Sequence, residues 1–167
     1  MGRLSMNPIA HLDPMGSLMI LFVGFGWAKP VPVDSRLLRN PRTDMMKVAA
    51  AGPIANLILA FASGLLLRIL STGELLPESM AVLMYYFTRI NITLAVFNMI
   101  PVAPLDGSQI FSGYLMKHNP QLAWKIQSFG PQVLFGLILF GYITGFSILW
   151  LIMSPFVNFL MFLFAGL

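Results

Sequence analysis

The last quarter of the chain contains no charged residue. Residues 126–167 form an uncharged run of 42 residues that is rich in Leu and Phe. As a single helix this run would be about 63 Å long, roughly twice the hydrocarbon thickness of a bilayer. It must therefore be interrupted. Pro131, which follows a glycine, predicts the start of a span near 131–153. Pro155 predicts a break before a shorter terminal helix near 155–167.

Two other long apolar runs precede this region. Residues 48–67 are 20 consecutive uncharged residues, the length of one spanning helix, and a second span is expected from about Ser79 to Pro104. Hydrophobic residues make up 57% of the chain and charged residues only 10%, which excludes an ordinary soluble domain. Arg89 interrupts the second span. Either it carries a functional charge, or its long side chain reaches towards the membrane interface, and the second interpretation is favoured.

The expected fold is an all-α membrane protein. It is a polytopic helical bundle with about three to four transmembrane helices in a single membrane-embedded domain, residues 1–167. The uncharged segment from Pro14 to Ala28 has 15 residues and three glycines. Because it is too short for a full span, we expect one short re-entrant or hairpin element near the N-terminus.

The basic residues predict the orientation of the bundle in the cell membrane. Seven of the ten fall in two segments, 29–47 and 107–125, which we expect to be cytoplasmic loops. The net charge of +4 thus reflects membrane topology, and nucleic acid is not an expected partner. The expected surroundings are a lipid bilayer.

Asp106 is a carboxylate at the end of the otherwise uncharged run NMIPVAPLDG. Pro101 and Pro104 must loosen the helix into extended chain before it, and Gly107 follows it. Irregular backbone at membrane depth requires a protein or water-filled cavity around it, so we expect Asp106 to face a polar pocket. Asn98, two helical turns earlier, could join that pocket or form an interhelical hydrogen bond. From the residues alone, both a capping role and a ligand or catalytic role remain open for Asp106.

The segment AAAGPIAN predicts a packing seam on the 48–67 helix. Gly52 allows close helix approach beside Pro53, and Asn56 can hydrogen-bond across the interface. We therefore expect these residues to act in structure rather than in chemistry. The chain has no cysteine, and its two histidines, His11 and His118, are far apart in sequence, which favours surface or capping roles for both.

Four motifs occur in a fixed order: GRLSMNPIAHLDPMGS, FGWAKPVPV, AAAGPIANL and AVFNMIPVAPLDGSQIF. Together they resemble the site-2 protease family of intramembrane zinc metalloproteases (peptidase M50 type), in its short prokaryotic form without a PDZ domain. The resemblance covers residues 2–112, the protease core. Residues 126–167 match only as additional C-terminal membrane helices.

The resemblance implies a function and a cofactor. In this family the Asp of the Asn-x-x-Pro-x-x-Pro-x-Asp-Gly signature is the third zinc ligand, which corresponds to Asp106. The Asn of the signature, here Asn98, positions the substrate carbonyl or its oxyanion. The implied reaction is hydrolysis of peptide bonds in transmembrane protein substrates by zinc-activated water. Ser108 and Gln109 stand where many relatives have Gly-Arg.

The family takes its other two zinc ligands and its general base from an HExxH sequence on a helix that precedes GRLSMNP. No HExxH sequence occurs among these 167 residues. Two expectations follow. The chain is an N-terminally incomplete metalloprotease, or it is a non-catalytic relative that acts as a membrane scaffold or helix-binding protein. In either case we expect these residues alone to bind zinc weakly.

Overall fold

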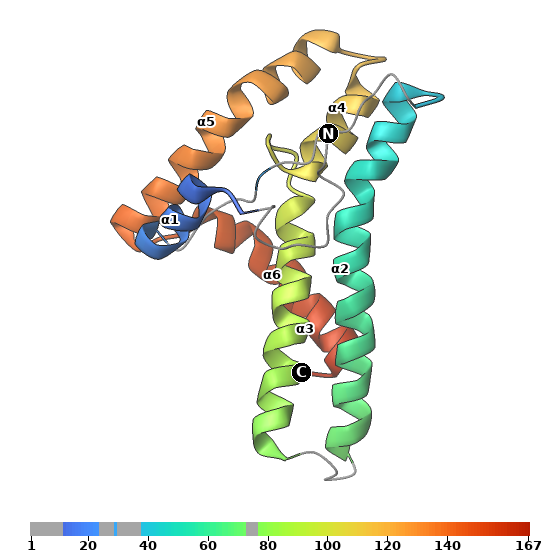
Figure 1. Ribbon diagram of the computed structural model, residues 1–167, viewed down its shortest axis with the longest axis vertical. Coiled ribbons are helices and arrows are strands. Elements are labelled where there is room, and N and C mark those ends of the chain that lie inside the picture. The colour runs from blue at the N-terminus through green and yellow to red at the C-terminus, as the bar shows by residue number, and fades with distance from the viewer. Residues whose placement is uncertain (1–11, 24–28, 30–37, 73–76) are drawn as a thin grey trace. The chain divides into compact units, whose positions relative to one another are not determined.

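A computed structural model describes residues 12–23, 29, 38–72 and 77–167, and the regular elements among them are helices (Figure 1). The chain divides into two compact units, Met1–Leu38 and Arg39–Leu167. Each unit is described by itself.

The first unit contains helix α1 (Pro14–Val23). Asp13 caps its N-terminus, because its carboxylate accepts a hydrogen bond of 2.9 Å from the backbone N–H of Gly16. Ten helical residues extend about 15 Å, only half of the membrane core. This agrees with a short N-terminal element. The return of the expected hairpin, at 24–28, lies outside the described residues.

The second unit contains the remaining helices, which are α2 (Pro41–Thr72), α3 (Glu78–Asn98), α4 (Asp106–Leu115), α5 (Pro120–Thr144) and α6 (Ile148–Ala165). The helices α2 and α3 run side by side in opposite directions, and α6 packs against both (Figure 1). The short helix α4 packs between α2 and α5. The buried core is apolar and draws on α2, α3, α5 and α6.

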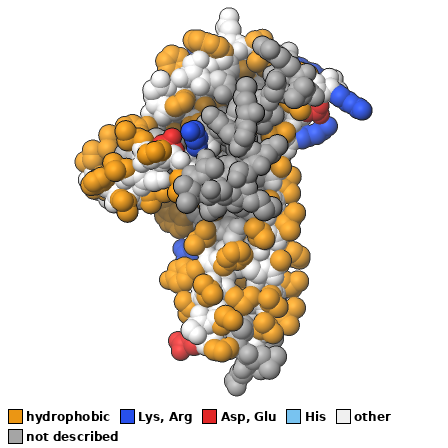
Figure 2. Space-filling model, in the orientation of Figure 1, with side chains coloured by type: hydrophobic (Ala, Val, Ile, Leu, Met, Phe, Trp, Pro, Cys, Tyr) orange, Lys and Arg blue, Asp and Glu red, His pale blue; other side chains and the backbone are white. Residues whose placement is uncertain are grey.

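Four described helices are long and apolar enough to cross a membrane: α2, α3, α5 and α6. Large hydrophobic side chains cover the outer surface of the paired α2 and α3 helices (Figure 2). Such extensive apolar surface fits lipid rather than water as the solvent. The all-α membrane bundle with three to four spans is therefore confirmed, and the chain is a multi-pass membrane protein.

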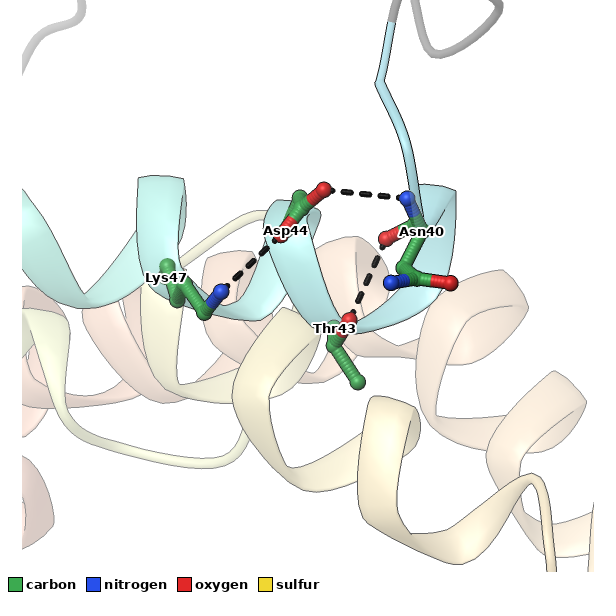
Figure 3. A network of polar contacts seen from close by, with 4 residues as sticks. All are labelled: Asn40, Thr43, Asp44 and Lys47. Atoms are coloured by element: carbon green, nitrogen blue, oxygen red, sulfur yellow. Dashed lines mark hydrogen bonds and ion pairs between the residues drawn. The ribbon is translucent and has the colours of Figure 1, made fainter.

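The first turn of α2 corrects the expected extent of the basic loop that precedes it. That loop was predicted to end at Lys47, but the helix already begins at Pro41. Proline suits the first helical position, where its missing N–H is not needed. The Asp44 carboxylate then accepts a 3.0 Å hydrogen bond from the Asn40 backbone N–H and pairs with Lys47 at 3.0 Å (Figure 3). These contacts stabilise the start of α2 at Pro41, which the sequence pattern did not predict.

The second predicted loop, 107–125, is also largely helical. It contains most of α4 and the first turn of α5, which leaves a turn of only four residues after Leu115. The side chain of Asn119 caps α5 by accepting a 3.0 Å hydrogen bond from the Leu122 N–H, and Pro120 occupies the first position of the helix. Polar composition here marks helix ends rather than a long loop.

The break in the uncharged C-terminal run was predicted at the wrong place. Pro131 and Pro155 lie inside α5 and α6, and the interruption falls between Thr144 and Ile148. Gly145 has φ +72°, a left-handed conformation that ends a helix and suits glycine. The Ser147 side chain then accepts a 3.1 Å hydrogen bond from a backbone N–H and caps α6. Neighbouring helices let membrane spans tolerate proline, so these prolines do not mark helix ends.

Candidate metal-binding site

The segment Met99–Leu105 connects α3 to α4 and contains no regular helix. It includes Pro101 and Pro104, and the peptide bond before Pro104 is cis. The second span, predicted to reach Pro104, thus ends earlier, at Asn98. The predicted loosening of the chain ahead of Asp106 is confirmed. As a result Asn98 is the last residue of α3 and Asp106 the first of α4.

Gly107 allows the start of α4 to pack closely against the backbone at the end of α3. A Cβ atom on Gly107 would overlap the carbonyl group of Met99 and lie 2.6 Å from the carbonyl oxygen of Ile100. Backbone atoms cannot move aside as a flexible side chain can, so this position requires glycine. The contact holds residue 107 against residue 99. Their chain neighbours, Asp106 and Asn98, are thereby kept at the same end of the bundle.

Gly130 of α5 supports the connection from another side. A Cβ atom there would lie 2.5 Å from the backbone nitrogen of Ala103 and 2.8 Å from its Cβ. The sequence predicted this glycine only as part of a helix start. Its role in packing arises from a contact across 27 positions of sequence, which no local pattern reveals.

The Asp106 carboxylate lies against α2. Its Oδ2 atom is 3.2 Å from the position that a Cβ atom on Gly52 would take. Asp106 is half-buried, and within the described part of the chain its carboxylate has no hydrogen bond and no ion pair. Burial raises the pKa of the Asp106 carboxyl above its ordinary value. Gly52, expected in a helix-packing seam, therefore also borders the candidate ligand.

The other residues of AAAGPIAN occupy different environments. Pro53 is buried inside α2, whereas Asn56 is half-buried and forms no hydrogen bond with another described residue. Asn56 thus makes no polar contact with α3. A 2.8 Å hydrogen bond between Ser63 of α2 and the buried Thr88 of α3 joins these two helices. Sequence analysis missed this pair, although isolated hydroxyl residues in apolar spans are a usable signal for such contacts.

The Asn98 amide is also without a hydrogen-bond partner among the described residues, and its side chain is half-buried. Two N–H donors and a carbonyl oxygen thus remain available at the end of α3. Asn98 and Asp106 are the two polar side chains that flank the connection. Neither is used to cap its own helix in the described structure.

A hydrogen bond between α4 and α5 adds rigidity next to Asp106. The Gln127 amide donates a 2.8 Å hydrogen bond to the Ser112 hydroxyl and a 3.4 Å one to the Ser108 carbonyl oxygen. The buried Ser108 hydroxyl itself donates to the Leu105 carbonyl oxygen at 2.8 Å. Ser108, one of the two departures from the common family sequence, is therefore accommodated within the start of α4.

A cavity of about 390 Å³ lies beside the same connection. It is bordered by Met99, Ile100 and Pro101 together with apolar side chains of α2, α3 and α6. Asp106 is not among its lining residues, so this cavity is not the polar pocket expected around the carboxylate. Its apolar walls suit hydrocarbon.

The described residues do not by themselves form a zinc site. No three His, Cys, Asp or Glu residues come together among them, whereas a catalytic zinc takes three protein ligands. His118 is exposed in the turn after α4, where its ring stacks on Tyr114 at a centroid distance of 5.1 Å. His11 lies outside the described residues. Asp106 is thus suited to supply one ligand of a larger set.

Comparisons with known proteins agree on one family. Residues 64–141 match the model of peptidase family M50. The chain is 38% identical over 154 residues to "Putative zinc metalloprotease YwhC" of Bacillus subtilis, which covers 89% of this chain and 69% of that protein. It is 29% identical over 132 residues to a zinc metalloprotease of Methanocaldococcus jannaschii, covering 78% of this chain and 38% of the relative.

No solved structure matches the chain. The similarity to YwhC nevertheless extends over most of both sequences, and the match to the family model includes Asn98, Asp106 and the connection between them. Zinc is the cofactor of this family. The chain therefore belongs to peptidase family M50, the site-2 protease family.

Proposed function

We propose that this chain acts in intramembrane proteolysis, as a zinc metalloendopeptidase of the site-2 protease type that hydrolyses peptide bonds in transmembrane protein substrates. The observation that carries the proposal is Asp106: a half-buried carboxylate without a described partner, at the family's ligand position. Bound zinc would supply an activated water for the hydrolysis.

Asp106 has the properties that a metal ligand needs. Its carboxylate oxygens are not engaged by described donors, so they remain free to bind a cation. Its backbone is held by the contact of Gly107 with Met99 and by the start of α4. The absence of a side chain at Gly52 leaves space at Oδ2. A rigid backbone and a free carboxylate are the combination expected of a preorganised ligand.

Asn98 is proposed to position the substrate. An amide N–H aimed at the scissile carbonyl stabilises the negative charge that develops on its oxygen during hydrolysis. The Asn98 amide has no described hydrogen-bond partner that would compete with a substrate. Pro101, Pro104 and Gly107 are proposed to be structural, since they shape the connection that carries both residues.

The proposal requires ligands beyond the described residues. Asp106 supplies one of three, and the HExxH sequence that provides the other two and the general base in this family is not among the 167 residues. We keep as the second candidate function a non-catalytic relative that serves as a membrane scaffold or helix-binding protein. The two candidates differ in whether Asp106 works together with an HExxH segment.

The proposed orientation places the 29–47 and 107–125 segments on the cytoplasmic side. The guanidinium of Arg42, at the start of α2, donates a 2.6 Å hydrogen bond to the carbonyl oxygen of Gly113 in α4. The start of α2 and the end of α4 thus meet at one end of the bundle. Arg39 and Arg42 lie at this start of α2 and Lys117 follows α4, an arrangement expected of a cytoplasmic side.

The test begins with the natural gene. An in-frame HExxH within about 40 codons upstream of Met1, room for one span and its flanks, favours the protease. The product of that gene, in proteoliposomes with zinc, should then cleave a fluorescent transmembrane substrate. Asp106→Ala should abolish cleavage, and His118→Ala, at an exposed histidine, should preserve it. A stop codon upstream would reject the protease in favour of the scaffold, and full cleavage by Asp106→Ala would reject Asp106 as a required zinc ligand.

A further inference from the structure

Arg89 is the one charged residue in the middle of a described membrane-spanning helix. It is the twelfth residue of α3, about 17 Å along the axis from Glu78 and about 14 Å from Asn98. Charge at such depth is costly in a bilayer and is usually paired or functional. Arg89 does not belong to the Asp106 site, so the presence of a charged residue in the middle of α3 needs a separate explanation.

The guanidinium of Arg89 is held in place by aromatic side chains. It donates a 2.7 Å hydrogen bond to the Tyr85 hydroxyl. Its central carbon lies 5.8 Å from the ring centroids of both Tyr85 and Trp150, so α3 and α6 together orient it. A guanidinium has five N–H donors, and within the described structure this hydrogen bond is the only one Arg89 donates. The guanidinium is therefore held in one position, but no described acidic residue pairs with its positive charge.

Within the described part of the second unit, no acidic residue stands at the depth of Arg89. The three acidic residues there, Asp44, Glu78 and Asp106, lie in the first turns of α2, α3 and α4. The acid on the same helix, Glu78, is about 17 Å away along the axis. A second copy of this described unit would bring the same distribution of charge. The described part of the second unit therefore holds no counter-charge for Arg89.

The surface around Arg89 has the form of a helix-binding face. Arg89 lines a depression of about 260 Å³ with Tyr86, Ile90, Thr93 and Leu94, all from α3. The side chains of Tyr86, Ile90 and Leu94 are exposed at i, i+4 and i+8, so they form one stripe along the helix. An apolar stripe of this spacing with one central polar group fits a second helix packed alongside.

We propose that this face of α3 binds a membrane-spanning helix from outside these 167 residues that carries an aspartate or glutamate near its middle, opposite Arg89. A carboxylate on a neighbouring helix complements the positive charge of Arg89. A lipid phosphate fits less well, because it lies at the membrane surface, whereas the aromatic contacts hold the guanidinium within the span. The inference does not depend on zinc or on proteolysis.

Binding to defined peptides tests the proposal. The protein is reconstituted in phosphatidylcholine vesicles with a dye-labelled peptide of about 20 leucines and alanines that carries one central Glu, or Gln at the same place. Energy transfer reports association. The Glu peptide should bind about 3- to 30-fold more tightly than the Gln peptide, the range that interhelical polar contacts give in membranes. Arg89→Gln should remove this preference, and Arg68→Gln, at an exposed arginine near the end of α2, should preserve it.

A second variant covers the possibility that Arg89→Gln does not fold. Ile90→Trp fills the depression at an exposed position and keeps the charge, and it should weaken binding of the Glu peptide. Equal binding of both peptides to the unaltered protein would overturn the proposal, as would a Glu preference that survives Arg89→Gln. Arg89-dependent retention of phosphatidylglycerol in native mass spectrometry, without a Glu preference, would assign the site to a lipid headgroup and also overturn it.

Discussion

The Oδ2 atom of Asp106 lies 3.2 Å from the position that a Cβ atom on Gly52 would occupy. Two motifs separated by more than fifty residues thus meet at one carboxylate. The motif on α2 supplies a surface without a side chain, and the motif on α4 supplies the charged group. The predicted packing residue Gly52 and the predicted ligand Asp106 are therefore neighbours in the structure.

Replacing Gly52 with Ala should disturb the ligand more than the fold. The added Cβ would press on the carboxylate, which can shift by a few tenths of an ångström. In the zinc-loaded natural gene product, we expect zinc affinity to fall by about 10-fold, as for changes that reposition a ligand. Zinc titration with a competing chelator measures this. Unchanged affinity in Gly52→Ala would show that the contact does not constrain Asp106.

Replacing Gly107 with Ala should destabilise the protein itself. The new Cβ would overlap the backbone of Met99 and Ile100, and forced repacking of this kind costs about 1 to 3 kcal/mol. Gly136→Ala in α5 is the matched control, because no atom lies within 4 Å of its new Cβ. That control should be neutral or stabilising. Denaturant unfolding in micelles compares the stability of the two variants. Equal stability would contradict the close packing of Gly107 against the backbone of Met99 and Ile100.

The sequence predicted the membrane bundle and the irregular connection before Asp106, because these depend on apolar run length and on local prolines. It did not predict the contacts of Gly52 and Gly130, which depend on how distant helices pack. The sequence did not predict the helix break at Gly145, because the prolines in this run give a stronger local signal for a break than a single glycine does. In a membrane, prolines such as Pro155 remain inside helices, while the left-handed Gly145 ends α5 and the capping Ser147 begins α6.

The hydrogen bond between Ser63 and Thr88 should contribute measurably to the pairing of α2 and α3. Removing either hydroxyl, by Ser63→Ala or Thr88→Val, should cost about 0.6 to 1.7 kcal/mol, the range for such bonds within membranes. The double variant should cost less than the sum of the two. Ser154→Ala is a control, since that hydroxyl bonds only within its own helix among the described contacts. Strict additivity would contradict the pairing.

Cysteine labelling can test the orientation, because the chain has no cysteine of its own. Ser35→Cys and Lys117→Cys should react from the cytoplasmic side, and Ser71→Cys, at the other end of α2, from the opposite side. The reason is the excess of basic residues near the first two positions and the contact of Arg42 with Gly113. Labelling of Ser35→Cys and Ser71→Cys from one and the same side would overturn this topology.

Asp106 is proposed to be a zinc ligand that needs partners beyond the described residues. Zinc content per chain, measured by elemental analysis on purified protein, tests this proposal most directly. The 167-residue chain should retain little zinc, whereas a natural gene product that includes HExxH should retain about one zinc per chain. Asp106→Ala should remove that zinc, and His118→Ala should not. Stoichiometric zinc in the 167-residue chain, or in Asp106→Ala of the natural product, would contradict the account.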